Sequence, residues 1–231
     1  MNPLDEVVRS VVSAARQGLR PVVVFDLDST LFDTAKRNLW ILRCWAENGP
    51  FREIVAGLPE AEFGWDATRP LLARVALSEG ELAELRRFWA DHFFTDEAVL
   101  HDAPAPGAAA FARAIHDSGG HVYYLTGRHV TGMAAGTAAA LTRHGFPLWR
   151  GRVTLHLKPT FEMGDERFKA MAVGDIADSG MTVATFDNEP GNCNVFLRAF
   201  PDANHFVFGN VRSPNAEVPD PRVVPLAAFT R

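Results

Sequence analysis

Several features that would assign a chain to a class are scarce or missing here. The only cysteines, Cys44 and Cys193, lie far apart and outside any metal-ligand spacing, which favours a reduced cytoplasmic protein but leaves a single disulfide open. No run of about 18 apolar residues occurs, so we expect no transmembrane helix. Residues 1–20 carry charges within their apolar pattern, which predicts an amphipathic helix rather than a signal peptide.

An excess of positive charge is missing as well. The 231 residues carry a net charge of −5, which gives no support for binding nucleic acid through its phosphates. The apolar fraction of 47% and the charged fraction of 22% are ordinary for a soluble globular protein, with no membrane partner expected and the oligomeric state open. Lysine is rare, since the chain has only three, Lys36, Lys158 and Lys169.

The most informative stretch is residues 21–30, where an apolar run with β-branched residues leads into two carboxylates. Such a run is typical of a buried strand in a parallel sheet, and open α/β sheets bind ligands beyond the carboxyl ends of their strands. Asp26 and Asp28 occupy that end. Two carboxylates so close repel each other unless a cation joins them, and Mg²⁺ prefers oxygen ligands. The alternative interpretation is a strand that ends in an Asp-rich turn.

Apolar runs alternate with helical patterns along much of the remaining chain. Further strands are predicted at residues 121–125, 152–157, 182–186 and 205–208. Strands that alternate with helices indicate an α/β fold with a parallel, doubly wound sheet. The Pro-rich tail from Ser213 is expected to lie along the surface.

Residues 36–100 break this alternation, because they contain no convincing strand. They predict a small helical cap in which Ser78 and Glu81 form a capping box at the start of a strong helix. The aromatic residues of this segment are more often core than a surface for ligands. The catalytic core is therefore expected to comprise residues 1–35 and 101–231.

Polar side chains stand where several predicted strands end. Thr126 follows the second strand, and Asp187 follows the fourth. Lys169 is expected in the first turn of a helix over residues 166–176, with Asp165 as its cap, just ahead of the fourth strand. Each residue alone is a weak signal, but their common position at one edge of a sheet points to a functional site.

These segments together resemble the motifs of the haloacid dehalogenase-like (HAD) hydrolase superfamily. Residues 22–30 match the first motif, residues 125–128 the second and residues 186–189 the fourth, and Lys169 can be the third. The resemblance implies a three-layer Rossmann-like core with strand order 5-4-1-2-3. It also implies a helical cap inserted just after the first motif, where residues 36–100 lie.

The resemblance assigns roles to the strand-end residues. Asp26 would be the nucleophile that forms an aspartyl-phosphate, and Asp28 would protonate the leaving oxygen and then accept a proton from water. Mg²⁺ would be held by Asp26, the backbone carbonyl of Asp28 and Asp187. Lys169 would offset the charge on the phosphoryl oxygens, which the Thr126 hydroxyl would hydrogen-bond.

Other roles are less sharply assigned. The Gly127 amide would bind the substrate phosphate, whereas Arg128 would either contact the phosphate or form a salt bridge at the start of a helix. Asn188 stands where many members of the superfamily have a second acid. Whether Asn188 or Glu189 helps to bind the metal is therefore open.

The lysine of the third motif has two candidates. Lys158 directly follows the third strand and precedes a proline. That strand lies at the sheet border in the implied order, so Lys158 starts farther from Asp26 than Lys169 does. We therefore favour Lys169.

The expected function is that of a Mg²⁺-dependent phosphatase that hydrolyses a small phosphomonoester. Asp28 favours phosphate chemistry, because a dehalogenase needs no acid two residues after the nucleophile. A phosphonatase would need a cap lysine, and the predicted cap has only Lys36, at its root. The alternatives are a phosphotransferase or phosphomutase of the same fold and a non-catalytic phosphate- or nucleotide-binding module, which would need no nucleophile–acid pair.

Overall fold

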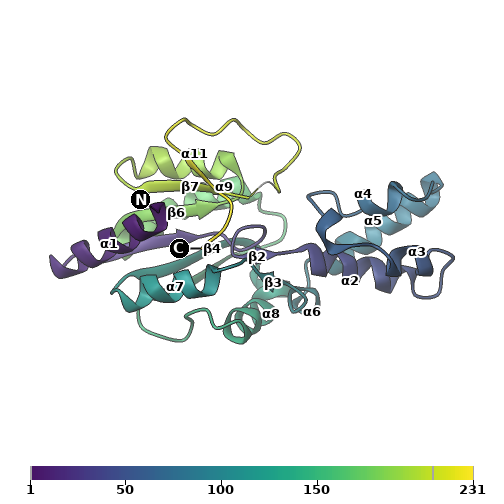
Figure 1. Cartoon of the computed structure of the whole chain (residues 1–231), viewed down its shortest axis with the longest axis horizontal. Coiled ribbons are helices and arrows are strands. Elements are labelled where there is room, and N and C mark those ends of the chain that lie inside the picture. Colours follow the sequence, from purple (N-terminus) through teal and green to yellow (C-terminus); the bar gives the residue numbers. More distant parts are fainter. Residues whose placement is uncertain (1, 210, 231) are drawn as a thin grey trace.

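The structure, a computed structural model, describes residues 2–209 and 211–230. Figure 1 shows a sheet flanked by helices and, at one end, a separate group of helices. No helix in the described part of the chain is long and apolar enough to cross a membrane. Cys44 and Cys193 are both free, so the disulfide that the sequence left open is not formed.

The main sheet brings together six strands from the described residues, and every neighbouring pair is parallel. In spatial order the strands are β5 (Val153–Lys158), β4 (His121–His129), β1 (Pro21–Phe25), β6 (Met181–Asp187), β7 (Asn204–Phe208) and β8 (Val224–Leu226). The five predicted strands are present, and from β7 to β5 they follow the implied order 5-4-1-2-3. The sheet therefore has one strand more than predicted.

The additional strand is β8, which pairs with β7 at the edge of the sheet. It lies in the tail for which the sequence predicts only a surface position. Three residues that include Pro225 carry no strand pattern of their own. Proline is tolerated at a sheet edge, where its missing N–H is not needed, so β8 forms because β7 offers backbone partners.

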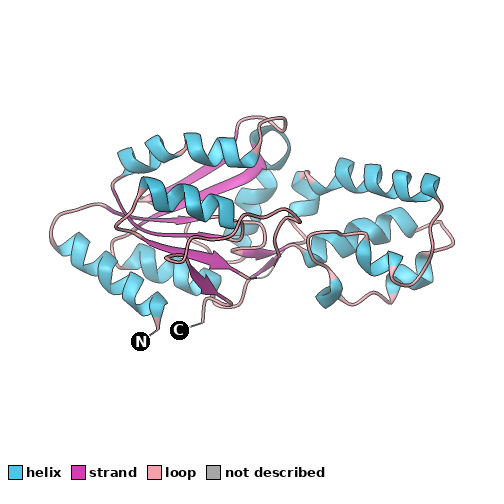
Figure 2. Ribbon diagram, turned by 90° about the horizontal axis from the view of Figure 1, so that it is seen from above, coloured by secondary structure: helices cyan, strands magenta, loops and turns pink. Residues whose placement is uncertain are grey.

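Alternate side chains of β1 point to opposite faces of the sheet, and helices cover both faces (Figure 2). Val23 and Phe25 belong to a cluster that includes residues of α1 (Pro3–Arg16), α7 (Ala108–Asp117) and α8 (Val130–Arg143). Val22 and Val24 belong to another cluster, with residues of α9 (Asp165–Met171), α10 (Val173–Ser179) and α11 (Pro190–Ala199). The two-residue period of the strand thus produces the three layers that were predicted.

The helix predicted over residues 166–176 is two short helices, α9 and α10. Gly164 is the N-cap of α9 and no side chain caps that end, so the expectation that Asp165 is the cap is wrong. The Asp165 carboxylate instead accepts a hydrogen bond from Lys158 Nζ at 2.7 Å, because the chain turns from β5 back towards α9. Since α9 has only seven residues, Lys169 lies in its last turn rather than its first.

The helical lobe comprises residues 35–93 and lies beyond the sheet in both views (Figures 1 and 2). Its elements are α2 (Ala35–Ala46), α3 (Arg52–Ala56), the 3₁₀ turn η1 (Glu60–Glu62), α4 (Arg69–Leu72) and α5 (Glu79–Phe93). The lobe has an apolar cluster of its own, which includes Leu39, Leu71 and Leu85. Ser78 and Glu81 form the predicted capping box at the start of α5.

The chain leaves and re-enters the core through a small antiparallel sheet. β2 (Phe32–Asp33) precedes the lobe and pairs with β3 (Ala103–Pro104), which follows it. Between the lobe and β3, α6 (Asp96–Val99) packs on α8 of the core. Gly136 permits this contact, because a Cβ there would lie 2.3 Å from the Asp96 backbone oxygen. The boundaries 36–100 of the cap stay a prediction.

Candidate active site

Asp26 and Asp187 lie next to each other because their strands are neighbours. β1 and β6 pair in parallel with Phe25 opposite Phe186, so the residue after each stands at the same edge of the sheet. The backbone N–H of Asp26 donates to the Phe186 carbonyl at 2.9 Å. Both carboxylates are buried. The strand pairing thus places two acidic groups together, as the sequence predicts.

Lys169 reaches both of these carboxylates from α9. Its Nζ donates to Asp26 Oδ1 at 2.8 Å and to Asp187 Oδ2 at 2.6 Å, and the side chain is buried. Lys158 instead donates to Asp165. Of the two candidate lysines, Lys169 is therefore the one in contact with the strand-end carboxylates, while its role towards a phosphoryl group stays a prediction.

The electrostatics of this cluster follow from its burial. Burial raises the pKa of Asp26 to about 7, with Lys169 opposing this effect and the Asp187 carboxylate adding to it. Burial works against the charge on Lys169, but the carboxylates of Asp187 and Asp26 raise its pKa above its ordinary value. Asp26 and Asp187 outnumber the single ammonium group between them, so the site can accommodate additional positive charge.

The turn after β1 orients the second oxygen of Asp26. Ser29 has a φ of +58°, a left-handed conformation that non-glycine residues seldom adopt. The turn brings Thr30 back over the strand end, where its hydroxyl donates to Asp26 Oδ2 at 2.9 Å. Both carboxylate oxygens of Asp26 therefore have fixed partners, and the side chain is held in one orientation.

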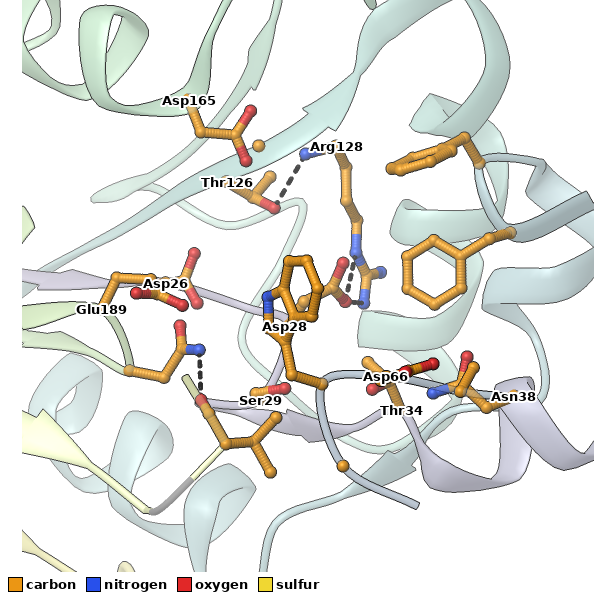
Figure 3. A pocket seen from close by; sticks show the side chains of 18 of the residues that line it. Asp26, Asp28, Ser29, Thr34, Asn38, Asp66, Thr126, Arg128, Asp165 and Glu189 are labelled. Carbon is orange, nitrogen blue, oxygen red and sulfur yellow. Dashed lines mark hydrogen bonds and ion pairs between the residues drawn. The ribbon is translucent and has the colours of Figure 1, made fainter. Parts of the chain in front are cut away.

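Asp28 belongs to a second cluster of charges, built from two arginines and another aspartate. Its Oδ1 accepts from Arg37 Nη2 at 2.8 Å and from Arg128 Nε at 3.1 Å, and Figure 3 shows Arg128 extended towards it. Asp102 accepts from Arg37 Nε at 2.8 Å and from Arg128 Nη2 at 2.7 Å. Burial alone would raise the pKa of Asp28, but Arg128 and Arg37 hold it well below its usual range. Asp28 is therefore a carboxylate in this arrangement.

Arg37 and Asp102 are site residues that the sequence analysis missed. Arg37 is fully buried in the first turn of α2, and Asp102 lies between α6 and β3. They stand 65 positions apart in the chain, so no local pattern connects them. The one available signal is the four-residue spacing from Arg37 to Ile41, which places the arginine on the apolar face of its helix. Their ion pairs join the root of the lobe to the sheet edge.

The second motif occupies the carboxyl end of β4. Thr126 is buried, and its hydroxyl accepts from the backbone N–H of Arg128 at 3.2 Å. Gly127 lies against the Asp165 side chain, and a Cβ there would come within 2.2 Å of Asp165 Oδ2, so a larger residue would have to displace that carboxylate. The sequence left two roles open for Arg128, a phosphate contact and a salt bridge. In the structure, Arg128 forms a salt bridge with Asp28. A contact between Arg128 and substrate stays a prediction.

Asn188 and Glu189 are both tied to the loop that follows β7. Asn188 Nδ2 donates to the Val211 carbonyl at 2.8 Å. The Glu189 carboxylate accepts from the Ser213 backbone N–H at 2.7 Å and from its hydroxyl at 3.0 Å. Among the residues described, no group of three or more His, Cys, Asp and Glu side chains is arranged to hold a metal. The predicted metal site has only two carboxylate side chains and a backbone carbonyl, so the finding on groups of three such side chains does not test it. The metal site stays a prediction.

A cavity of about 530 Å³ lies between the sheet edge and the helical lobe (Figure 3). The predicted site residues that line it are Asp26, Asp28, Thr126, Gly127, Arg128 and Lys169. Asp187 does not line the cavity, but it accepts a hydrogen bond from Lys169, which does. From the lobe side, the cavity is lined by aromatic residues of the segment for which the sequence favours a core role over a ligand surface: Trp65, Trp89, Phe93 and Phe94.

Comparisons with known proteins identify the fold. No family model and no curated protein matches the sequence. A Clostridium difficile protein provisionally described as a phosphatase has a similar structure, with a TM-score of 0.57 at 10% identity over 82% of this chain and 85% of that one. A predicted phosphatase from Clostridium acetobutylicum has a TM-score of 0.51 at 13% identity, over 90% and 94% of the two chains. At such identities the likeness shows the fold alone.

Proposed function

Because the chain has the fold of the haloacid dehalogenase-like hydrolase superfamily, we propose that it is a hydrolase of phosphoric monoesters. The observation that carries this proposal is the contact of Lys169 with both Asp26 and Asp187 at the carboxyl edge of the sheet. Asp28 lines the same cavity as Asp26, so a nucleophile and a proton-transfer group face one space. A simple binding protein would need neither group.

Asp26 is the proposed nucleophile. Thr30 and Lys169 each hold one of its oxygens, which fixes the carboxylate for attack on phosphorus. Attack forms an aspartyl-phosphate and breaks the P–O bond to the alcohol, whose oxygen takes a proton from Asp28; Asp28 regains that proton from the water of the second step. Water then attacks the phosphorus, releases phosphate and restores Asp26. Thr126 and Gly127 line the same cavity, and we propose that the Thr126 hydroxyl and the Gly127 amide donate to the phosphoryl oxygens.

Asp28 is the proposed proton-transfer residue. The two guanidinium groups of Arg37 and Arg128 favour its ionised form. That form can accept a proton from the water that attacks the aspartyl-phosphate. Donation of a proton to the leaving alcohol needs the protonated form, which the same ion pairs oppose. The arrangement thus supports the role of Asp28 in the second step more strongly than its role in the first.

The residues of the site fit Mg²⁺. Asp26 and Asp187 present carboxylate oxygens at one place, and their charge exceeds that of the single ammonium between them. We propose that these two carboxylates and the backbone carbonyl of Asp28 hold the ion. When bound, Mg²⁺ would supply positive charge to the phosphoryl oxygens.

The helical lobe is proposed to act as the cap over this site. It supplies one wall of the cavity, and its root residue Arg37 is ion-paired with Asp28 and Asp102. A wall formed by a separate lobe can exclude water and select the leaving group without altering the sheet edge.

Release of phosphate from p-nitrophenyl phosphate tests the proposal. We expect turnover by the wild-type protein and none by Asp26→Asn, with unchanged circular dichroism for the variant. Transfer of phosphate to an added sugar phosphate in place of water would identify a phosphotransferase or mutase. Binding of phosphate without any turnover would contradict an enzymatic role and favour a non-catalytic module.

A further inference from the structure

The wall that the lobe gives to the cavity is aromatic. Trp65 precedes α4, Trp89 and Phe93 belong to α5, and Phe94 follows it. These rings line the same space as Asp26 and Lys169. A substrate held by its phosphate at the sheet edge would therefore extend its leaving group towards indole and phenyl rings.

Three of these rings lie outside the apolar clusters, whereas Phe94 packs against the cluster of the core. Among the described residues, the apolar clusters include none of Trp65, Trp89 and Phe93. Trp65 is 56% exposed, which is unusual for so large an apolar side chain. The cluster within the lobe uses other aromatic residues, Trp45 and Phe51. Exposed apolar surface in a concave site is typical of ligand binding.

Two of the rings are fixed in place before any ligand binds. Trp89 Nε1 donates to Asn38 Oδ1 at 2.9 Å, which satisfies the only polar atom of the indole. Trp89 and Phe93 stack with ring centroids 4.6 Å apart, and Arg37 Cζ lies 4.4 Å from the Phe93 centroid. This part of the wall therefore offers apolar ring surface rather than hydrogen bonds.

Two polar oxygen atoms on the same wall have partners within the protein. Asn38 accepts the indole N–H of Trp89, and Asp66 Oδ1 accepts both the backbone N–H and the hydroxyl of Thr68, at 2.9 and 2.7 Å. A leaving group covered with hydroxyls would lose water against the ring surfaces and regain no hydrogen bonds from them, which is costly. A flat aromatic group would lose little and gain stacking contacts. Arg86, which also lines the cavity, can donate to polar atoms at the edge of such a group.

We infer that the substrate is a phosphomonoester whose alcohol carries a flat aromatic ring, of the chemical class of nucleoside 5′-monophosphates, and that Trp65 stacks on that ring. The inference rests on the proposed phosphatase function. The cavity of about 530 Å³ lies within the usual range for small-molecule sites and is larger than a phosphate group alone would need.

The test compares esters with the same reacting group. The four common nucleoside 5′-monophosphates and ribose 5-phosphate all release a primary 5′-alcohol, so a difference in kcat/KM reports on the base. We expect at least one nucleotide to exceed ribose 5-phosphate by about tenfold or more, the range that base–aromatic stacking commonly gives.

A pair of tryptophan variants locates the effect. Trp65→Ala should lower kcat/KM for the preferred nucleotide about tenfold and reduce its advantage over ribose 5-phosphate, whereas Trp65→Phe should restore much of that advantage. Trp149→Ala is the matched control, because Trp149 is 78% exposed and does not line the cavity. It should leave the kcat/KM of both substrates unchanged.

The possible results distinguish a failure of the aromatic-substrate inference from a failure of the proposed phosphatase function. Turnover of p-nitrophenyl phosphate with equal, or equally absent, activity on nucleotides and ribose 5-phosphate would overturn the aromatic substrate and leave the phosphatase standing. An unchanged nucleotide advantage in Trp65→Ala would overturn the role of Trp65. No phosphate release from any of these esters would overturn the proposed function, and the inference with it.

Discussion

The sheet edge and the aromatic wall of the lobe enclose one cavity, but different forces hold their side chains. At the sheet edge, Asp26 and Asp28 are fixed by ion pairs with buried Lys169 and Arg128. On the lobe, Trp89 and Phe93 are fixed by ring contacts and a single indole hydrogen bond. The charged side carries the proposed chemistry, and the apolar side carries the proposed selectivity. Arg37 connects the two sides, because it is ion-paired with Asp28 and its guanidinium lies over the Phe93 ring.

The largest loss of activity is expected from a substitution on the charged side. Asp26→Asn removes the proposed nucleophile while keeping a side chain of nearly the same size, so phosphate release should fall to the background rate. The fold should remain intact, as judged by circular dichroism and thermal unfolding. Activity within a few-fold of wild type would remove Asp26 from the nucleophilic role.

Removal of divalent metal should have a comparable effect on the same side. Asp26 and Asp187 carry more negative charge than Lys169 offsets, so incubation with EDTA should abolish phosphate release and added Mg²⁺ should restore it. The measurement is the initial rate before and after chelation and re-addition. Full activity in a preparation shown by elemental analysis to be free of metal would contradict the Mg²⁺ assignment.

Replacing each of the two lysines in turn shows which one contributes to catalysis at the sheet edge. Lys169→Ala should lower kcat by about 10²-fold or more, which is a common result when one electrostatic stabiliser is lost. Lys158→Ala should change kcat little, because Lys158 contacts Asp165 and not the strand-end carboxylates. Side-by-side assays on p-nitrophenyl phosphate decide this. A larger loss in Lys158→Ala would show that the third motif has been assigned to the wrong lysine.

Arg37 connects the lobe to the sheet edge. Its replacement should affect stability, and its effect on phosphate release should be smaller than those of Asp26→Asn, metal removal and Lys169→Ala. Arg37→Ala removes a buried partner of Asp102, which should lower the free energy of unfolding by about 3–5 kcal/mol, while Arg128 still holds Asp28. The exposed Arg43 on the same helix is the matched control, and Arg43→Ala should stay within about 0.5 kcal/mol. Urea unfolding of both variants gives the comparison. Equal stabilities would mean that the Arg37 ion pairs contribute nothing net.

The charged side was largely predictable from the sequence because its residues follow strands. A buried apolar run ending in Asp26, and another ending in Asp187, place both residues at one sheet edge whatever the rest of the chain does. Lys169 was harder to place, since its helix is shorter than its pattern indicates and the chosen lysine lies in the last turn. The Lys169 side chain nevertheless extends to the carboxyl edge of the sheet, as expected, and its contacts there with both carboxylates were not predicted.

Long-range partners escaped the sequence analysis for a physical reason. Arg37 and Asp102 meet only because the lobe folds back through β2 and β3, and nothing near either residue indicates the other. β8 likewise depends on the free edge of β7. The sequence favours a core role for the aromatic wall, because hydrophobic residues at helical spacing form the same pattern whether they face a core or a cavity.

The central claim is that phosphate passes through a covalent bond to Asp26. The most direct measurement is intact-protein and peptide mass spectrometry after rapid acid quenching of the enzyme during turnover of p-nitrophenyl phosphate, with Asp26→Asn treated in parallel. We predict a mass gain of one phosphoryl group that maps to the peptide containing Asp26 and is absent from the variant. A phosphoryl group on another residue, or the same gain in Asp26→Asn, would contradict the claim.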